Sequence, residues 1–444
     1  MKKSKLSMTF GVLAAAALLL GGRGAFADET VAWGNNYNGE LGNGTTSNSD
    51  VPVLVTGMSS EVTAVTAGAN CSLAIQNGGL YAWGNNEYGQ LGNGTTTSSN
   101  TAVAVTGMSS GVTAVAAGGG THSLAIQNGG LYAWGYNGDG ELGNGTTGNS
   151  DVPVLVTGMS SGVTAVAAGN AHSLAIQNGG LYAWGSNIYG QLGNGTTGNS
   201  DVPVLVTGMS SGVTAVAGGQ VHSLAIRNGG LYAWGWNAYG QLGNGTTNNS
   251  DVPVLVTGMS SGVTAVAGGL ANSLAVKNGN VYAWGYNNDG QLGDGSSGIG
   301  VDSPELIDPT DLTNIVAVAA GDNSSYALSS DGSLWVWGYD AYGQLGLGTV
   351  TAAFSTPQHL LPPLGYRYTS IAANGTYGYD AVATLAPVPE PSTLVLGGVA
   401  GFGLLAYCWR RRQLARRVAT AVDTAPAALT FPRLLATEAC QRVA

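Results

Sequence analysis

The chain has 444 residues, of which 44% are hydrophobic and only 9% charged, a composition that argues against a disordered protein. Its 73 glycines, set among runs of Ala, Val, Leu and Thr, indicate strands and turns rather than helices. The stretch 28–386 holds three basic residues, Arg227, Lys277 and Arg367, against 21 acidic ones, a net charge of -18. This charge argues against nucleic acid and anionic membrane surfaces as partners, because phosphate binding needs clustered Lys and Arg.

Residues 1–27 have the order of a secretory signal peptide. Three lysines precede an apolar run from Met8 to Leu20, and the small-residue sequence Ala25-Phe26-Ala27 follows it. A short membrane anchor is the alternative, although the run is shorter than most spanning helices. The sequence therefore predicts export and a folded part that begins at residue 28.

A Trp-Gly pair that ends an apolar strand recurs along the chain and defines a repeat. The intervals between successive tryptophans are 50, 51, 50, 50, 50 and 53 residues. Such a period indicates one supersecondary unit that needs its neighbours to bury its apolar faces. The seven tryptophans are Trp33, Trp83, Trp134, Trp184, Trp234, Trp284 and Trp337.

Each repeat predicts four antiparallel strands. In the copy that begins at Val163, a strand of small residues is followed by a strand from His172 and another that ends at Trp184. Asn178-Gly179 between the last two is a hairpin signal, and Pro203 places the fourth strand at a sheet edge. Equivalent hairpins are expected at Asn77-Gly78, Asn128-Gly129, Asn228-Gly229 and Asp331-Gly332.

These strands predict an all-β fold, a seven-bladed β-propeller over residues 28–386. The competing β-solenoid has shorter repeats. The small-residue strand suits the crowded axis, whereas Trp and Tyr suit the wider space between blades. The first repeat begins at its Trp33 strand, and the last, from Tyr368 to Val382, lacks a Trp-Gly pair. We therefore expect the N-terminal strand to complete the last blade and close the ring.

Three histidines at equivalent positions of adjacent blades are candidate metal ligands. A zinc site needs its imidazole nitrogens within about 2.0 to 2.1 Å of one ion, whereas equivalent positions on a ring diverge. A polar side chain that satisfies a turn backbone is the favoured explanation. The first residue of the second strand is, blade by blade, Cys71, His122, His172, His222, Asn272, Ser324 and Tyr377.

The Asp- and Asn-rich loops invite a calcium interpretation. The loops at Asn137–Gly140 and Asn288–Gly290 lack the regular acidic spacing of an EF-hand, so Asx-turns explain them better. The sequence also shows neither a phosphate-binding Gly loop nor a catalytic constellation. We therefore expect no enzyme activity, no metal and no cofactor.

Two positions in the loop after each Trp-Gly pair vary most among otherwise near-identical copies. Corresponding loops of a propeller emerge on one face, and Tyr and Trp supply contact area at low entropy cost. Neutral drift after recent duplication is the alternative explanation. The predicted ligand-binding face consists of Tyr88, Tyr136, Tyr189, Trp236, Tyr239, Tyr286, Tyr339 and Tyr342.

The C-terminal part contains a second apolar run, from Leu394 to Trp409, that is long enough for a transmembrane helix. An arginine cluster follows it and should stay in the cytoplasm, which leaves the repeats outside. The segment 387–412 resembles the PEP-CTERM sorting signal of Gram-negative bacteria, on Pro389, Glu390, Pro391, Arg410, Arg411 and Arg412. The resemblance implies processing by an exosortase. A plain single-span anchor is the alternative, and residues 413–444 form an additional cytoplasmic or disordered tail.

The repeats resemble the RCC1 (regulator of chromosome condensation) family over about residues 30–384. One motif of that family matches the stretch from Trp184 to Gly193, and the other matches Ala167–Ile176. The resemblance implies a seven-bladed propeller. The founding member is an exchange factor for the Ran GTPase, but the basic tails that it uses on chromatin are missing here. Exported bacterial members, including a propeller that inhibits β-lactamase, are better analogues.

Together these features predict an exported, non-enzymatic and monomeric propeller. It is expected to bind a protein or glycan at the cell envelope or in the extracellular matrix, anchored in the inner membrane before exosortase processing. Inhibition of a secreted enzyme is the main alternative. Guanine-nucleotide exchange, as in eukaryotic members of the resembled family, is the third.

Overall fold

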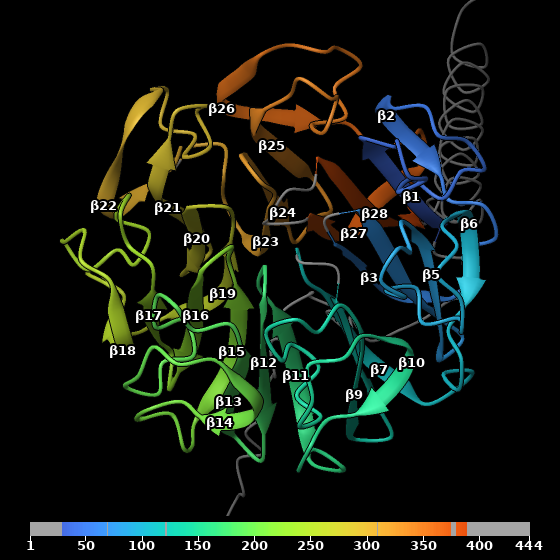
Figure 1. The fold of residues 1–444 in the computed structure, drawn as a ribbon. Coiled ribbons are helices and arrows are strands. Elements are labelled where there is room, and N and C mark those ends of the chain that lie inside the picture. Colours follow the sequence, from blue (N-terminus) through green and yellow to red (C-terminus); the bar gives the residue numbers. More distant parts are fainter. Residues whose placement is uncertain (1–28, 69, 120–121, 309, 374–378, 389–444) are drawn as a thin grey trace, which may run out of the picture. The chain divides into compact units, whose positions relative to one another are not determined.

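The computed structural model describes residues 29–388 except 69, 120–121, 309 and 374–378. In this part of the chain, 28 strands form seven four-stranded antiparallel sheets arranged around one axis (Figure 1). The alternating apolar pattern and the Gly-containing turns of each repeat produce one such sheet. The described residues therefore form the predicted all-β, seven-bladed propeller.

Blades 1 to 6 each take four consecutive strands, ordered from the axis to the rim. Blade 1 has β3 (Val62–Ala67), β4 (Cys71–Gln76), β5 (Gly79–Gly84) and β6 (Ser99–Ala104); blade 2 has β7 (Val112–Ala117), β8 (His122–Gln127), β9 (Gly130–Gly135) and β10 (Ser150–Leu155); blade 3 has β11 (Val163–Ala168), β12 (His172–Gln177), β13 (Gly180–Gly185) and β14 (Ser200–Leu205). Blade 4 has β15 (Val213–Gly218), β16 (His222–Arg227), β17 (Gly230–Gly235) and β18 (Ser250–Leu255); blade 5 has β19 (Val263–Gly268), β20 (Asn272–Lys277), β21 (Asn280–Asn287) and β22 (Gly298–Leu306); blade 6 has β23 (Ile315–Ala320), β24 (Ser324–Ser329), β25 (Leu334–Tyr339) and β26 (Ala353–Leu360).

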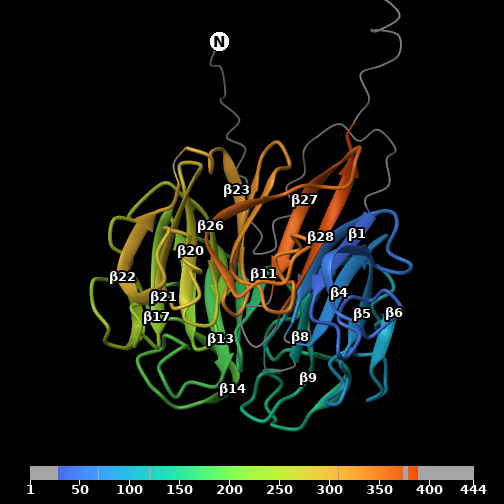
Figure 2. The same cartoon turned by 90° about the horizontal axis from the view of Figure 1, so that it is seen from above.

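Blade 7 combines β27 (Tyr366–Ala373) and β28 (Asp380–Pro387) with β1 (Glu29–Gly34) and β2 (Ser49–Leu54) (Figure 1). β1 pairs antiparallel with β28, and Ala32 lies opposite Val382. The Trp33 indole N–H donates to the Gln344 carbonyl of blade 6 at 2.8 Å. Strands from the two ends of the propeller thus share one sheet, which Figure 2 shows from a second direction.

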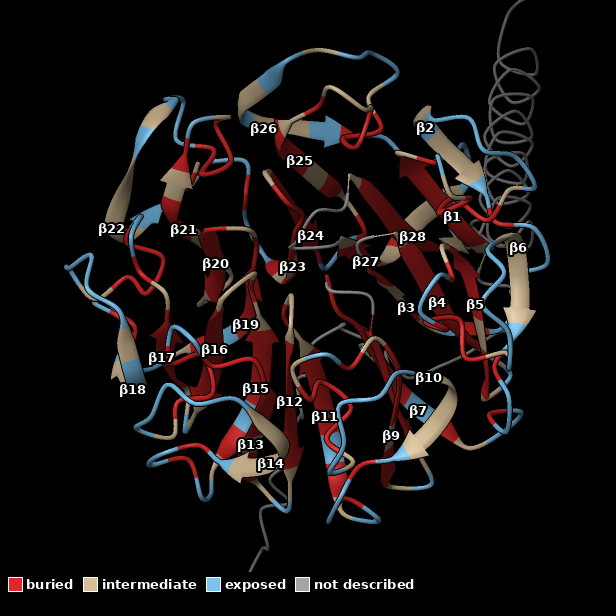
Figure 3. Ribbon diagram, in the orientation of Figure 1, coloured by how far each residue is buried: buried red, intermediate tan, exposed pale blue. Residues whose placement is uncertain are grey.

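The core lies between neighbouring blades, and each interface contains one repeat tryptophan. Trp184 of blade 3 is fully buried against Leu124 and Leu131 of blade 2. Its indole N–H donates to the Glu141 carbonyl at 2.8 Å. Figure 3 shows buried strands toward the axis and partly exposed strands at the rim, where β14 carries Pro203 as predicted. Packing between blades therefore holds the ring together.

The Asn-Gly hairpins adopt the conformation that the sequence predicts. Asn178 and Gly179 have φ values of 52° and 80°, a left-handed pair that suits the twist of antiparallel strands. The hairpin predicted at Asp331-Gly332 also forms, because β24 pairs antiparallel with β25, but its turn differs from the Asn-Gly turns. β24 ends at Ser329 and β25 begins only at Leu334, so the loop is longer, and Asp331 accepts a hydrogen bond from the Ser333 amide at 2.9 Å.

Several predicted segments lie outside the described residues. These are the signal peptide at 1–27, the apolar span from Leu394 to Trp409 and the tail at 413–444. Among the residues that the structure does describe, no helix has both the length and the apolar character needed to cross a membrane.

Candidate ligand-binding face

In most blades, one buried asparagine fixes the loop after the Trp-Gly pair through hydrogen bonds to the loop backbone. The Asn187 amide nitrogen donates to the carbonyls of Thr196 and Gly198 at 2.9 and 3.0 Å, and its Oδ1 accepts from the Leu192 amide at 2.9 Å. These bonds fix the loop while the neighbouring residues stay at the surface, as an Asx-based turn does. The same position holds Asn36, Asn86, Asn137, Asn187, Asn237, Asn287 and, in blade 6, Asp340.

The two variable loop positions meet across blade boundaries. Tyr88 of blade 1 contacts Tyr136 of blade 2, with ring centroids 5.2 Å apart and planes at 77°. Tyr239 of blade 4 contacts Tyr286 of blade 5 in the same way, at 4.9 Å and 67°. The second variable residue of one loop thus packs on the first variable residue of the next loop. Such edge-to-face pairs contribute about 0.5–1.5 kcal/mol beyond the area that they bury.

All eight predicted residues take part in these ring contacts, which form three clusters on one face. Tyr379, just before β28, completes the third cluster and was missed in the sequence, because it belongs to the irregular last repeat. We call this surface the aromatic face. Its clusters are Tyr88 with Tyr136; Tyr189, Trp236, Tyr239 and Tyr286; and Tyr339, Tyr342 and Tyr379.

Several rings of the aromatic face are exposed to solvent. Tyr88, Tyr189 and Tyr239 are 40%, 37% and 45% exposed, while Trp236 and Tyr286 are partly buried by their neighbours. Ile188, beside Tyr189, adds a further exposed apolar side chain. Rings that are fixed by neighbours but exposed at one edge can bind a partner with little loss of side-chain entropy.

Carboxylates accompany each aromatic cluster. Burial raises the pKa of Tyr136, and the nearby Glu141 and Asp139 raise it further. Burial also raises the pKa of Tyr379, whose hydroxyl is hydrogen-bonded to Asp322. Asp289 acts in the same direction on Tyr286 and Tyr339. The aromatic face therefore carries negative charge beside its rings.

Glu141 is a buried acid beneath the first cluster. One carboxylate oxygen accepts from the Asp139 amide at 2.9 Å, but Oε1 is buried without a hydrogen-bond partner. In the blade 7 loop, Glu40 has both oxygens paired, with the Asn38 amide and side chain. Burial accordingly raises the pKa of Glu141 to about 7.

The three basic side chains of the repeats lie at the opposite ends of the strands. Arg227 and Lys277 end β16 and β20 at their hairpins and donate to the Ser211 and Gly258 carbonyls. Arg367 lies near the turn at Gly332. Cationic side chains are therefore segregated from the aromatic face.

The three histidines link blades rather than converge. His172 Nε2 lies 3.0 Å from the Ser223 hydroxyl of the next blade, which itself donates to the Gln191 carbonyl. Because the serine proton is used in that way, the histidine must donate through Nε2–H. His122 and His222 pair likewise with Ser173 and Ser273. The expected partner, a turn backbone, is thus replaced by a serine one repeat later.

Burial keeps these imidazoles neutral. It lowers the pKa of His122 and His222 to about 4 and that of His172 to about 3. In the last blade Asp380 occupies the equivalent position, opposite Gly34, whereas Tyr377 lies outside the described residues. The assignment of Tyr377 to this position is wrong, because the last repeat carries additional residues before the strand.

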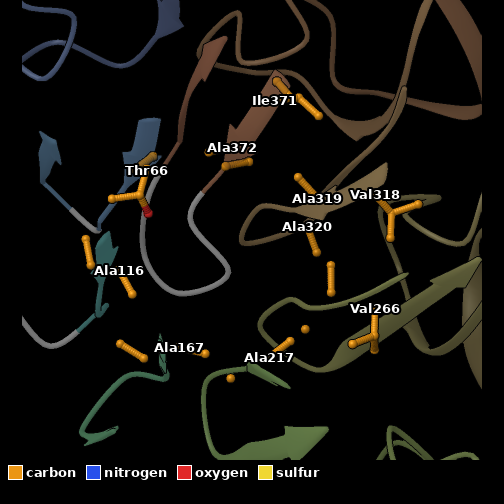
Figure 4. A pocket seen from close by; sticks show the side chains of 17 residues that line it. Thr66, Ala116, Ala167, Ala217, Val266, Val318, Ala319, Ala320, Ile371 and Ala372 are labelled. Carbon is orange, nitrogen blue, oxygen red and sulfur yellow. The ribbon is translucent and has the colours of Figure 1, made fainter. Parts of the chain in front are cut away.

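The described residues offer no group of three or more His, Cys, Asp or Glu side chains arranged to hold a metal ion. A cavity of about 130 Å³ lies on the axis, and small apolar side chains from the innermost strands line it (Figure 4). Among the described residues that line it, Thr66 has the one polar side chain.

Comparisons with known families match most of the chain. The model described as RCC1-like domain matches residues 26–313, and two models of the regulator of chromosome condensation (RCC1) repeat match 315–344 and 331–377. The PEP-CTERM protein-sorting motif matches 387–412. Both predicted resemblances are confirmed. The motif residues Pro389, Glu390, Pro391 and Arg410–Arg412 lie outside the described residues.

Solved structures of similar fold include human WBSCR16, at 25% identity and a TM-score of 0.71, covering 81% of this chain and 99% of that one. Prp20p from Saccharomyces cerevisiae has 19% identity and a TM-score of 0.71, covering 85% and 96%, so this likeness concerns the fold alone. Human HERC4, a probable E3 ubiquitin-protein ligase, is 42% identical over 65 residues, which are 15% of this chain. That stretch is 6% of the length of HERC4.

Proposed function

Since this chain belongs to the RCC1-like domain family and carries a PEP-CTERM sorting motif, we propose that it is an exported, non-enzymatic binding protein. The sorting motif indicates export and sorting to the cell surface. The aromatic face is the proposed binding surface, and its partner is a protein or glycan of the cell envelope or matrix. Propeller folds of this family typically act as regulators without catalysis.

One observation supports this proposal most: the variable loop residues of separate repeats form three packed aromatic clusters on one face. A surface of exposed tyrosines is unusual for an isolated protein, because water-exposed apolar patches favour association. Tyr and Trp are also the residues that contribute most to binding interfaces. The constant blades then serve as a rigid support for the variable tips.

The test is binding of the purified protein to isolated cell-surface material from its host. Replacement of Tyr189, Trp236, Tyr239 and Tyr286 by Ala should abolish binding, since it removes the largest cluster. A matched control replaces Leu155, Leu205 and Leu255 by Ala. These side chains are each 46% exposed, but on the rim strands. The control should bind normally.

Thermal unfolding of both variants shows whether the fold survives the substitutions. If the aromatic variant keeps its fold and binds as well as the unmodified protein, the aromatic face is not the binding surface. Loss of binding in the rim control instead would assign the interaction to the outer strands.

A further inference from the structure

The charge of the aromatic face restricts the chemistry of its partner. Asp139 and Asp289 are half-buried beside the first and second clusters, and Glu87 is exposed next to Tyr88. Asp322 is hydrogen-bonded to Tyr379 in the third cluster. A ligand that carries negative charge would be repelled by this surface.

Within the part of the chain that the structure describes, no basic side chain lies on this face to neutralise these acids. The basic residues of the repeats, Arg227, Lys277 and Arg367, lie at the hairpin ends of the strands. The carboxylates of Glu87, Asp139 and Asp289 therefore attract an incoming positive charge, and Asp139 does so while its Oδ1 accepts a hydrogen bond from the Asn199 side-chain amide at 2.9 Å. Ring faces attract the same charge through cation–π contacts.

The geometry of the rings favours a Lys or Arg side chain over a sugar ring as the group that contacts them. Six of the seven ring pairs on this face are edge-to-face or tilted, and only Tyr342 with Tyr379 is stacked. The edge of one ring thus covers part of the face of the next. A flat sugar ring needs a wide uncovered aromatic face, whereas a thin Lys or Arg side chain needs only the uncovered part of one ring face beside a carboxylate.

We propose that the aromatic face binds a Lys- or Arg-bearing segment of another protein, with its cationic side chains placed between the rings and the carboxylates of Glu87, Asp139 and Asp289. This inference rests on the proposed function and specifies its partner. The carboxylates supply the charge complementarity, and the tyrosine rings supply contact area and cation–π attraction.

A labelled peptide of alternating Arg and Gly is a direct probe, and a peptide of alternating Gln and Gly is its neutral match. Fluorescence anisotropy with the full chain should show binding of the Arg peptide that weakens as salt is raised. The variant with Glu87→Gln, Asp139→Asn and Asp289→Asn should bind it about tenfold more weakly, since exposed cation and ion-pair contacts are individually modest. Asn38 occupies the position equivalent to Asp139, so the fold tolerates this change.

A control with the same change in charge places Glu61→Gln, Glu305→Gln and Asp311→Asn away from the aromatic face, all at exposed positions. It should bind the Arg peptide like the unmodified protein. Equal affinity of the acidic-site variant and the unmodified protein would overturn the inference. So would equal binding of the Gln peptide, or tighter binding of chitosan oligomers, which carry amines on a glycan.

The outcomes also separate this inference from the proposed function. If cell-surface material binds through the aromatic residues but is insensitive to loss of Glu87, Asp139 and Asp289, the binding face stands and the cationic partner is wrong. If the aromatic variant binds that material unchanged, the proposed function itself fails.

Discussion

Replacement of His222 by Asn should reduce the sensitivity of the fold to acid. His222 is fully buried and neutral, and its Nε2 lies 3.1 Å from the Ser273 hydroxyl. Burial lowers its pKa from 6.5 to about 4, so the unfolded chain binds a proton that the folded chain does not. Stability from this group is full above pH 6.5 and is lost as the pH falls toward 4. Asn272 stands at the same position in blade 5, which makes Asn a natural replacement.

The expected magnitude follows from proton linkage. Between pH 8 and pH 5 the unfolded imidazole becomes almost fully protonated and the folded one only slightly, which costs about 2 kcal/mol. Glu141, Asp340 and Asp380 have raised pKa values and shift stability in the opposite direction over this range. The difference between protein and variant cancels their effect, so it isolates the histidine.

Urea unfolding followed by tryptophan fluorescence at pH 8 and pH 5 measures this difference. The variant should lose about 2 kcal/mol less than the unmodified protein between the two pH values. Ser273→Ala removes the hydrogen-bond partner but leaves the buried imidazole, so it should destabilise at both pH values and keep the full pH dependence. An equal loss of stability in the His222→Asn variant and the unmodified protein would refute the assignment of a buried neutral imidazole.

Three further substitutions test the inter-blade contacts. Gly193→Ala should destabilise by about 1–3 kcal/mol in urea unfolding, since φ is 64° and a Cβ would lie 2.6 Å from Trp234 Nε1; a neutral effect would show that the contact can relax. Trp184→Phe removes one of the two donors to the Glu141 carbonyl, the other being the Ser173 hydroxyl, and leaves a cavity at a fully buried position, so it should cost about 1–3 kcal/mol by the same assay; no loss would mean that the indole contact is dispensable. Glu141→Gln should stabilise by about 3 kcal/mol at pH 8, and the gain should vanish below pH 4.5, because the folded pKa is about 7; a gain independent of pH would point to a cause other than ionisation.

The regular parts of the fold are predictable because the same strand and turn signals recur in each repeat. Spacing of the tryptophans gives the blade count, and Asn178-Gly179 gives its hairpin through the left-handed backbone that only such residues adopt easily. Asp331-Gly332 also marks a hairpin, but the longer loop between β24 and β25 changes its turn. Local patterns therefore suffice where the copies agree.

Contacts between blades cannot be predicted from the sequence pattern within one repeat. The position of Tyr88 opposite Tyr136, and of His172 opposite Ser223, depends on how adjacent sheets are rotated. Tyr379 was missed for a different reason: the last repeat departs from the common spacing. The face could be predicted as a set of loops, but not as three packed clusters.

The three aromatic clusters are all carried by the propeller, in which β1 pairs with β28 in blade 7. Hydrogen exchange on the full chain, resolved by peptide mass spectrometry, tests this pairing directly. We expect Glu29–Gly34 to exchange as slowly as Gly180–Gly185, the equivalent strand of blade 3. Exchange of Glu29–Gly34 at the rate of the loops, with Gly180–Gly185 protected, would contradict it.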